Sequence, residues 1–515
     1  MADGQVQKQI RALLAALMFC ASCLVPSSSW AGPDPALIKL DQQLTELSDF
    51  LTQDSAALRL PLGQLMQRTG LTGLTPDLPS PVRGPVTAPK ATDFPTHMAS
   101  ASVENFRTAL ALLTQVHGGQ DNLDILNAHP GERPEALTFR SGLVTLDHIR
   151  ASLAQTFPQA QMQPRDNILR VPIILWDDTV LQLEPEDHLK LSRRDGAFII
   201  SFGRVEMTGS RVSVVGDASP NSKDFVPFVT IGGGGALQTD GAVFQGLGFG
   251  KSPKFSGLSV VAHPLLPSVG KTRIADTYFD DLHTVSLTGI SDARVTGSQF
   301  YNMRNNALLL STSIRTKVHG NLFFGSSPTN AIRVLRGSDH STLQGNVLLQ
   351  GDRSGILVQG QSNNVEVSGN VIWRRGGGAI KISRSNCVGV RRNVILNSRQ
   401  KGVDIRASNQ ITVQANTISG SRSAGIWVSD QPRGAVTYVS DNTLRQNKAG
   451  LSTATGGQLM LVGNDLSDQF PRLIEGDIAL QNRAIVTNLR GDVPMLMSAG
   501  DTQYPARAGL ADCEL

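Results

Sequence analysis

Basic side chains recur at equal spacing in the second half of the chain, where they could bind an anionic polymer. Arg333 and Lys381 are 48 residues apart, and so are Arg336 and Arg384. Residues 304–406 contain 15 Lys and Arg but only four Asp and Glu. Such a periodic excess of positive charge predicts a cationic stripe. No nucleic-acid-binding motif accompanies it, so the predicted partner is an acidic polysaccharide rather than nucleic acid.

The same segments add polar and aromatic side chains to this stripe. Alternate residues of a β-strand point to opposite faces, so each outward position of a repeated strand forms a column from one repeat to the next. The outward residues and those of the following turn are the candidate substrate-binding groups, namely Ser311, Arg333, Gln359, Lys381, Arg384, Arg406 and Trp427.

Two histidines are candidates for proton transfer. His263 and His283 fall just after and just before strands of earlier repeats on the same face, and histidine is the most common general acid or base in enzymes. The sequence has no GxSxG or HExxH motif and no Cys or His spacing typical of a metal site. We therefore expect neither a metal nor another cofactor.

These residues require a repeating scaffold, and the chain contains one. Five copies of one short strand begin 24, 24, 23 and 23 residues apart. The copies read AIRVLR (331–336), GILVQG (355–360), AIKISR (379–384), GVDIRA (402–407) and GIWVSD (425–430). A fixed period of this length, with short strands and Gly or Asn at the corners, is typical of a solenoid. The sequence predicts an all-β fold, a parallel β-helix.

Two stacks of side chains are predicted inside this solenoid. The inward residues of the repeated strands form the first stack, which comprises Ile332, Ile356, Ile380, Val403 and Ile426. Asparagines at a repeated corner form the second, which comprises Asn321, Asn346, Asn370, Asn393, Asn416, Asn442 and Asn464. Stacked amides at a corner satisfy one another and the turn backbone. We interpret these asparagines as structural rather than catalytic.

Changes of pattern divide the chain into five segments. Residues 1–31 are typical of a signal peptide, since two basic residues precede an apolar run and a small-residue cleavage site follows it. This run is too short to indicate a membrane span. We predict a helical and Pro-rich N-terminal extension (32–135) with a helix at 101–119, irregular first coils (136–254), a regular β-helix with coils of 22–26 residues (255–470) and a C-terminal cap (471–515).

The signal peptide predicts export to the periplasm. The number of cysteines adds little evidence about this location. Beyond residue 31 only Cys387 and Cys513 remain, and one pair is not a disulfide framework. We expect Cys387 to be a buried, unreactive thiol.

From about residue 136 to 430 the sequence resembles the periplasmic mannuronan C5-epimerases of bacterial alginate export. Four stretches carry this resemblance: LKLSRRDGAFIISFGRVEMTGSRV (189–212), PFVTIGGG with VFQGLGF (227–249), SGLSVVAHP (256–264) and YFDDL (278–282). The resemblance implies a right-handed parallel β-helix that acts on an alginate-like polymer. It also implies other periplasmic exopolysaccharide proteins as partners, which the N-terminal extension would contact.

The resemblance also implies a reaction and a place for it. In that family a base removes the C5 proton of a uronate, an arginine neutralises the carboxylate, and a proton returns from the other face. The arginine corresponds to Arg336. The family's Asp-Pro-His-Asp motif corresponds to residues 309–312, which read Leu-Leu-Ser-Thr, so Ser311 stands where the catalytic histidine is expected.

This departure leaves three hypotheses open. The active site could be shifted and use His263 or His283 together with Arg336. The protein could be a non-catalytic guide that retains the polysaccharide groove without the chemistry. It could also act on another uronate-containing polymer, by epimerisation or by β-elimination, because both reactions begin with removal of the C5 proton. We favour a polysaccharide-modifying protein of the epimerase type.

Overall fold

The computed structural model describes residues 34–53, 60, 62–71, 95–129, 133–263, 265–266, 268–507 and 513. The predicted signal peptide and nearly all of the Pro-rich stretch at 75–95 lie outside these residues. The chain divides into two compact units at residue 42, and helix α2 (Pro35–Gln53) crosses this boundary. A second helix, α3 (Leu62–Arg68), follows it.

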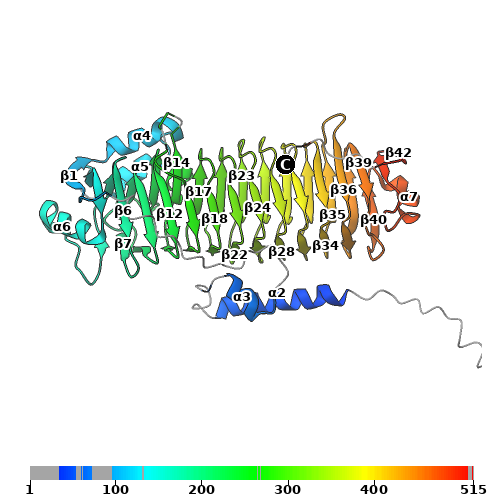
Figure 1. Cartoon of the computed structure of the whole chain (residues 1–515), viewed down its shortest axis with the longest axis horizontal. Coiled ribbons are helices and arrows are strands. Elements are labelled where there is room, and N and C mark those ends of the chain that lie inside the picture. The colour runs from blue at the N-terminus through cyan, green and yellow to red at the C-terminus, as the bar shows by residue number, and fades with distance from the viewer. Residues whose placement is uncertain are drawn as a thin grey trace, which may run out of the picture. The chain divides into compact units, whose positions relative to one another are not determined.

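Three long sheets run side by side along a β-solenoid, and each coil contributes one strand to each of them (Figure 1). We number the sheets in the order in which one coil visits them. Except at the two ends, neighbouring strands of a sheet pair in parallel. The predicted parallel β-helix is therefore confirmed.

Sheet 1 has 15 strands and carries the predicted stripe. Its strands are β1 (Ser100–Asn105), β2 (Glu135–Arg140), β5 (Ile173–Leu175), β8 (Ile199–Ser201), β11 (Val229–Gly233), β14 (Gly257–Ala262), β17 (Thr284–Thr288), β20 (Leu308–Ser311), β23 (Ile332–Leu335), β26 (Ile356–Gln359), β29 (Ile380–Ser383), β32 (Val403–Arg406), β35 (Ala424–Ser429), β38 (Ala449–Ala454) and β40 (Arg472–Gly476).

Sheets 2 and 3 complete the coils. Sheet 2 consists of β3 (Gly142–Val144), β6 (Thr179–Leu183), β9 (Arg204–Thr208), β12 (Ala236–Asp240), β15 (Arg273–Ala275), β18 (Arg294–Thr296), β21 (Lys317–His319), β24 (Thr342–Gln344), β27 (Glu366–Ser368), β30 (Gly389–Arg391), β33 (Ile411–Gln414), β36 (Val436–Ser440), β39 (Gln458–Val462), β41 (Met495–Ser498) and β42 (Asp501–Gln503). Sheet 3 consists of β4 (Ile168–Leu169), β7 (His188–Ser192), β10 (Arg211–Val215), β13 (Val243–Gln245), β16 (Tyr278–Asp280), β19 (Gln299–Tyr301), β22 (Leu322–Phe324), β25 (Val347–Leu348), β28 (Val371–Trp373), β31 (Val394–Leu396), β34 (Thr417–Ser419) and β37 (Thr443–Arg445).

The predicted register of sheet 1 is confirmed residue by residue. Ile332 pairs with Ile356, which pairs with Ile380, and the stack continues through Val403 to Ile426. All five side chains are at most 1% exposed. Burial of such side chains supplies most of the free energy that holds successive coils together.

The asparagine ladder is also confirmed. In each step the side-chain Nδ2 donates to Oδ1 of the next asparagine at 2.9 Å, as from Asn370 to Asn393. The same Oδ1 accepts the backbone N–H of Asn370, and Nδ2 of Asn393 donates to the carbonyl of Val367. Each amide before the last one, Asn464, is thus bonded to two neighbouring coils, which satisfies these buried polar groups without water.

Antiparallel strands close both ends of the solenoid. At the N-terminal end β1 pairs antiparallel with β2. The helix predicted at 101–119 begins only at residue 107 (α4, Arg107–His117), because residues 100–105 form this edge strand. At the C-terminal end β41 and β42 form an antiparallel pair. Such pairs cover the open edge of a sheet that would otherwise template association.

The remaining short helices lie in the connections between strands. They are α5 (Asn122–Ala128), α6 (Leu146–Thr156), α7 (Asn482–Val486) and the 3₁₀ turns η3 (Pro158–Ala160), η4 (Pro253–Phe255) and η5 (Ala479–Gln481). Among the described residues, no helix combines the length and the apolar character needed to span a membrane.

The prediction that Cys387 is a buried, unreactive thiol is wrong. Cys387 forms a disulfide with Cys513, with the two Cα atoms 5.6 Å apart. Cys387 is only partly buried, in the turn between β29 and β30. The sequence separation of 126 residues concealed this contact, because the sequence does not show that Cys513 lies beside a coil in the middle of the solenoid.

Candidate functional site

A groove of about 790 Å³ runs over the outer face of sheet 1. Outward side chains of β23, β26, β29 and β32 form its floor, which comprises Arg333, Leu357, Gln359, Lys381, Ser383 and Arg406. The loops that enter sheet 1 form one wall with Pro328, Thr329, Asn330, Arg353 and Ser354. The turns that leave sheet 1 form the other wall with Arg384, Ala407 and Asp430. Five of the seven predicted substrate-binding residues therefore line one groove.

Strand pairing places the floor residues in columns. Arg333 pairs with Leu357, Leu357 with Lys381, and Lys381 with Asp404. Neighbouring strands lie about 4.8 Å apart, so the cationic groups of Arg333 and Lys381 are two steps apart with an apolar side chain between them. The period of the sequence repeat becomes a regular spacing of charge along the groove.

Arg333 is the most distinctive cation of the floor. Its Nε is buried and has no hydrogen-bond partner. Burial lowers the pKa of this guanidinium, and the charge of nearby Arg336 lowers it further. An unsatisfied buried donor costs free energy, and an anionic ligand would remove that cost by accepting the hydrogen bond.

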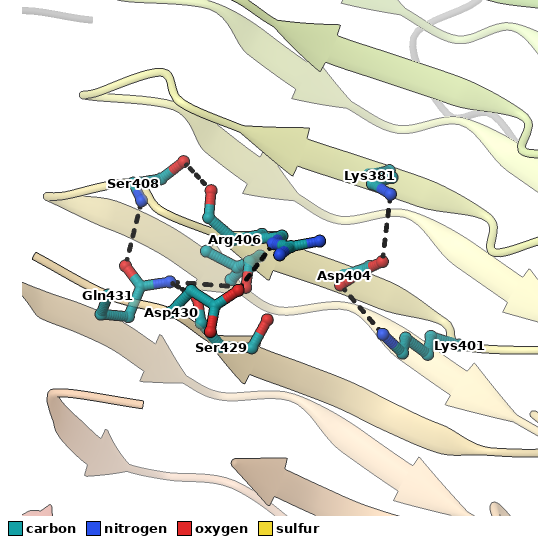
Figure 2. Close-up of polar contacts among 9 residues, drawn as sticks. Lys381, Lys401, Asp404, Arg406, Ser408, Ser429, Asp430 and Gln431 are labelled. Carbon is teal, nitrogen blue, oxygen red and sulfur yellow. Dashed lines mark hydrogen bonds and ion pairs between the residues drawn. The ribbon is translucent and has the colours of Figure 1, made fainter. Parts of the chain in front are cut away.

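The other cations of the groove differ in their partners. Arg353 and Arg384 are exposed, and no carboxylate in the described part of the chain forms an ion pair with either. Lys381 lies 3.9 Å from Asp404, and Arg406 lies 2.7 Å from Asp430 (Figure 2). Uncompensated positive charge therefore gathers over β23–β29.

Arg336 lies in the turn after β23, beside the groove rather than in its lining. It is exposed and has a positive φ of 56°. The equivalent residue of later coils is also left-handed, as at Gly360, Arg384 and Ala407. This conformation is needed to turn the chain sharply out of sheet 1, and it projects the arginines of this column along the edge of the groove.

The two candidate histidines lie on opposite edges of sheet 1 and outside the groove lining. His263 follows β14 and borders an apolar cavity of about 120 Å³ that His117 and Leu266 also line. His283 precedes β17, and its Nε2 lies 3.2 Å from Nδ2 of Asn305. Oδ1 of Asn305 accepts a hydrogen bond from Thr329, which does line the groove.

Burial lowers the pKa of His283, and the neighbouring Arg304 adds to this effect. The imidazole is therefore neutral at neutral pH, as a general base must be. Its contact with Asn305 connects it to the groove, because Asn305 is bonded to Thr329.

The two remaining predicted binding residues also lie outside the lining. Ser311 is 5% exposed in β20, one coil before Arg333. Trp427 is partly buried in β35, and Lys401 Nζ lies 4.4 Å from the centre of its ring. The register of both is as predicted, but neighbouring side chains limit access to them.

Sequence reasoning missed the loop wall of the groove and the residue beneath it. Arg375 is 1% exposed and donates to the carbonyls of Arg353 and Leu349 and to Oγ of Ser327. Burial lowers its pKa to about 10, so it remains cationic. A Cβ at Gly351 would collide with this guanidinium. Gly351 and the glycines directly after Arg375, of which Gly376 and Gly377 approach the backbone of residues 352–354, were the sequence signal of such close packing.

Comparison with known proteins agrees with this architecture. Residues 330–476 match the model of a right-handed β-helix region, and residues 268–386 match the model of a periplasmic copper-binding protein, NosD. The crystal structure of the periplasmic alginate epimerase AlgG superposes with a TM-score of 0.64 and 18% identity, covering 74% of this chain and 94% of that one. The fold is a right-handed parallel β-helix.

One curated relative extends the comparison to sequence. A mannuronan C5-epimerase of Pseudomonas putida strain KT2440 is 23% identical over 262 residues, which is 47% of this chain and 49% of the relative. The chain thus matches about half the length of that protein. It is distantly similar to mannuronan C5-epimerases.

The name of one matching family, NosD, refers to copper binding. In the part of the chain that the structure describes, no group of three or more His, Cys, Asp and Glu side chains could hold a metal ion. That match coincides with the regular coils from β15 to β29.

Proposed function

We propose that this protein binds a uronate-containing polysaccharide in the groove of sheet 1 and epimerises its residues at C5. The observation that carries the proposal is the cluster of cations without carboxylate partners over β23–β29, which includes the buried and unpartnered Nε of Arg333. A row of guanidinium and ammonium groups suits a linear chain of carboxylates. The similarity to mannuronan C5-epimerases supports the choice of reaction.

The reaction needs a neutralised carboxylate and two proton-transfer groups. Arg333 and Arg336 would hold the carboxylate of the reacting uronate, because Arg336 follows β23 directly and its charge acts on the guanidinium of Arg333. A base would then take the C5 proton, and an acid would return a proton from the opposite face of the ring. His283 is the better placed of the two candidate bases, since Thr329 connects its partner Asn305 to the groove.

Proton exchange in heavy water tests this proposal. Epimerisation incorporates deuterium at C5 of oligouronates, and NMR detects the label whichever epimer accumulates. His283→Gln should abolish the exchange while leaving polymer binding within about twofold, because the arginines carry the binding. Exchange at the wild-type rate in this variant would remove His283 from the mechanism.

A non-catalytic guide is the second candidate. It is favoured because neither His263 nor His283 lines the groove and because Ser311 stands at the position of the family's histidine. A guide would bind polyuronate in a salt-dependent manner without deuterium incorporation and without the unsaturated product of β-elimination. Finding both products absent, with binding intact, would establish the guide.

We also infer that the protein works in the periplasm. The predicted signal peptide at residues 1–31 and the disulfide between Cys387 and Cys513 support this, since disulfides persist in oxidising compartments. Periplasmic exopolysaccharide proteins are the proposed partners of the N-terminal extension. Fractionation of cells with and without residues 1–31 tests the location.

A further inference from the structure

The charge of sheet 1 changes along the axis of the solenoid. From β20 onward the outward columns hold only neutral and cationic side chains until Asp404 in β32. Beyond that point carboxylates appear at Asp430 after β35 and at Glu475 in β40, whereas β38 (Ala449–Ala454) between them has none. The groove therefore begins with a cationic part over β23–β29, in which Arg333, Arg353 and Arg384 have no carboxylate partner among the described residues, and continues into a part with both signs of charge.

Each cation in the second part of the groove already forms an ion pair with a carboxylate. Asp404 lies between two lysines, with Lys401 Nζ at 3.3 Å and Lys381 Nζ at 3.9 Å (Figure 2). Arg406 Nε lies 2.7 Å from Asp430. The side chain of Asp404 is 13% exposed and that of Asp430 is 51% exposed. A uronate placed here would meet cations that already have carboxylate partners.

The same ion pairs suit uncharged sugars. A sugar hydroxyl both donates and accepts hydrogen bonds, and a paired carboxylate and guanidinium offer one acceptor and one donor side by side. Carboxylate oxygens have more lone pairs than one cation uses, so Asp430 can accept from a hydroxyl while it is bound to Arg406. Ser429 and Gln431 lie beside this pair (Figure 2).

We propose that the groove recognises an acidic heteropolysaccharide, with uronate residues over β23–β29 and neutral sugars over β32–β35. This inference rests on the proposed function, because it presumes that an acidic polysaccharide occupies the groove. It adds that Asp404 and Asp430 determine specificity by excluding a second block of uronates and by accepting hydrogen bonds from hydroxyl groups.

The test compares two probes and two matched variants. The probes are oligogalacturonates of increasing length, which carry a carboxylate on every sugar, and hyaluronan oligosaccharides, in which uronates alternate with neutral N-acetylhexosamines. The variant Asp404→Asn/Asp430→Asn removes both carboxylates with little change of shape. Asp292→Asn is the control, because Asp292 forms a comparable exposed pair with Arg315 at 2.8 Å but does not line the groove.

Wild-type affinity for oligogalacturonate should stop increasing once the oligomer fills the cationic part. In Asp404→Asn/Asp430→Asn it should continue to increase with length by about two- to fivefold, the range that exposed ion pairs produce. Affinity for hyaluronan oligosaccharides should not increase in that variant. The control should behave as the wild type does with both probes.

The outcomes separate the two proposals. If the wild type binds neither probe, the proposed polysaccharide function itself fails. If the wild type binds both probes but the double variant shows the same length dependence and the same ratio of affinities, the division of the groove is wrong and the function stands.

Discussion

Arg333 is a partly buried residue with one buried donor that has no hydrogen-bond partner, whereas most buried polar groups in proteins are hydrogen-bonded. Its Nε is buried and unbonded, and its guanidinium lies at the cationic part of the groove. Lys317, in contrast, is exposed on sheet 2 and outside the groove. The two residues carry equal charge in different environments, so they form a matched pair.

We therefore predict that Arg333→Gln weakens binding of polyuronate roughly tenfold, the effect of one hydrogen bond to a charged group. It should also reduce the dependence of affinity on salt, because one fewer cation faces the polymer. Titrations at several salt concentrations measure both effects. Lys317→Gln should leave both unchanged, and an equal loss in the two variants would show that only net charge matters.

Buried histidines make stability depend on pH. Burial is the first cause that lowers the pKa of His117, His188 and His283 below the ordinary value of 6.5. The folded protein therefore binds fewer protons than the unfolded chain as the pH falls below 6.5, so that their contribution to stability is present above this value and lost as the pH falls.

The midpoint of thermal unfolding should accordingly decrease from neutral to mildly acidic pH. His283→Gln should make this decrease shallower, because one of the three groups no longer titrates. Differential scanning calorimetry across this range measures both curves. A parallel curve for the variant would show that His283 does not contribute.

The corner between sheets 2 and 3 is held by the asparagine ladder. Oδ1 of Asn393 accepts two hydrogen bonds from Asn370, and Nδ2 of Asn393 donates to the carbonyl of Val367 and to Oδ1 of Asn416. Because these groups are 0–1% exposed, no water replaces a missing partner.

Asn393→Ala should lower the free energy of unfolding by roughly 2–4 kcal/mol, since it leaves several buried polar groups of neighbouring coils unsatisfied. Denaturant unfolding followed by circular dichroism measures the loss. Gln400→Ala is the control, because Gln400 is exposed on the loop between β31 and β32, and it should change stability by less than about 0.5 kcal/mol. Equal stability of the two variants would contradict the structural role of the ladder.

At the scale of the whole molecule, the disulfide connects the C-terminal residues to the middle of the solenoid. Cys513 is 126 residues from Cys387, so the bond closes a loop that includes β30 to β42. A long closed loop restricts the unfolded chain more than a short one does.

Cys513→Ser should therefore lower the free energy of unfolding by about 2–4 kcal/mol, and Cys387→Ser should have the same effect. The double variant should be no less stable than either single variant, because all three remove one bond. Mass spectrometry of the non-reduced, digested protein detects the linked peptides directly. Additive losses, or an absence of linked peptides, would refute the bond.

The spacing of residues along the chain was sufficient to predict the solenoid and the register of sheet 1. A period of 23–24 residues allows each coil to stack on the last in only one way, so Ile380 is buried and Lys381 points outward. The same periodicity revealed the asparagine ladder and five residues of the groove. These features depend on residues one coil apart, whose relation is visible in the linear sequence.

The walls of the groove, the partners of its charges and the disulfide required the three-dimensional structure. Arg353 and Arg375 belong to loops that break the regular pattern, and Asp430 reaches Arg406 across coils in a turn. Cys513 bonds to Cys387, which is 126 residues earlier in the chain. The periodicity constrains neither the loops nor the chain end, so their contacts follow from packing in three dimensions.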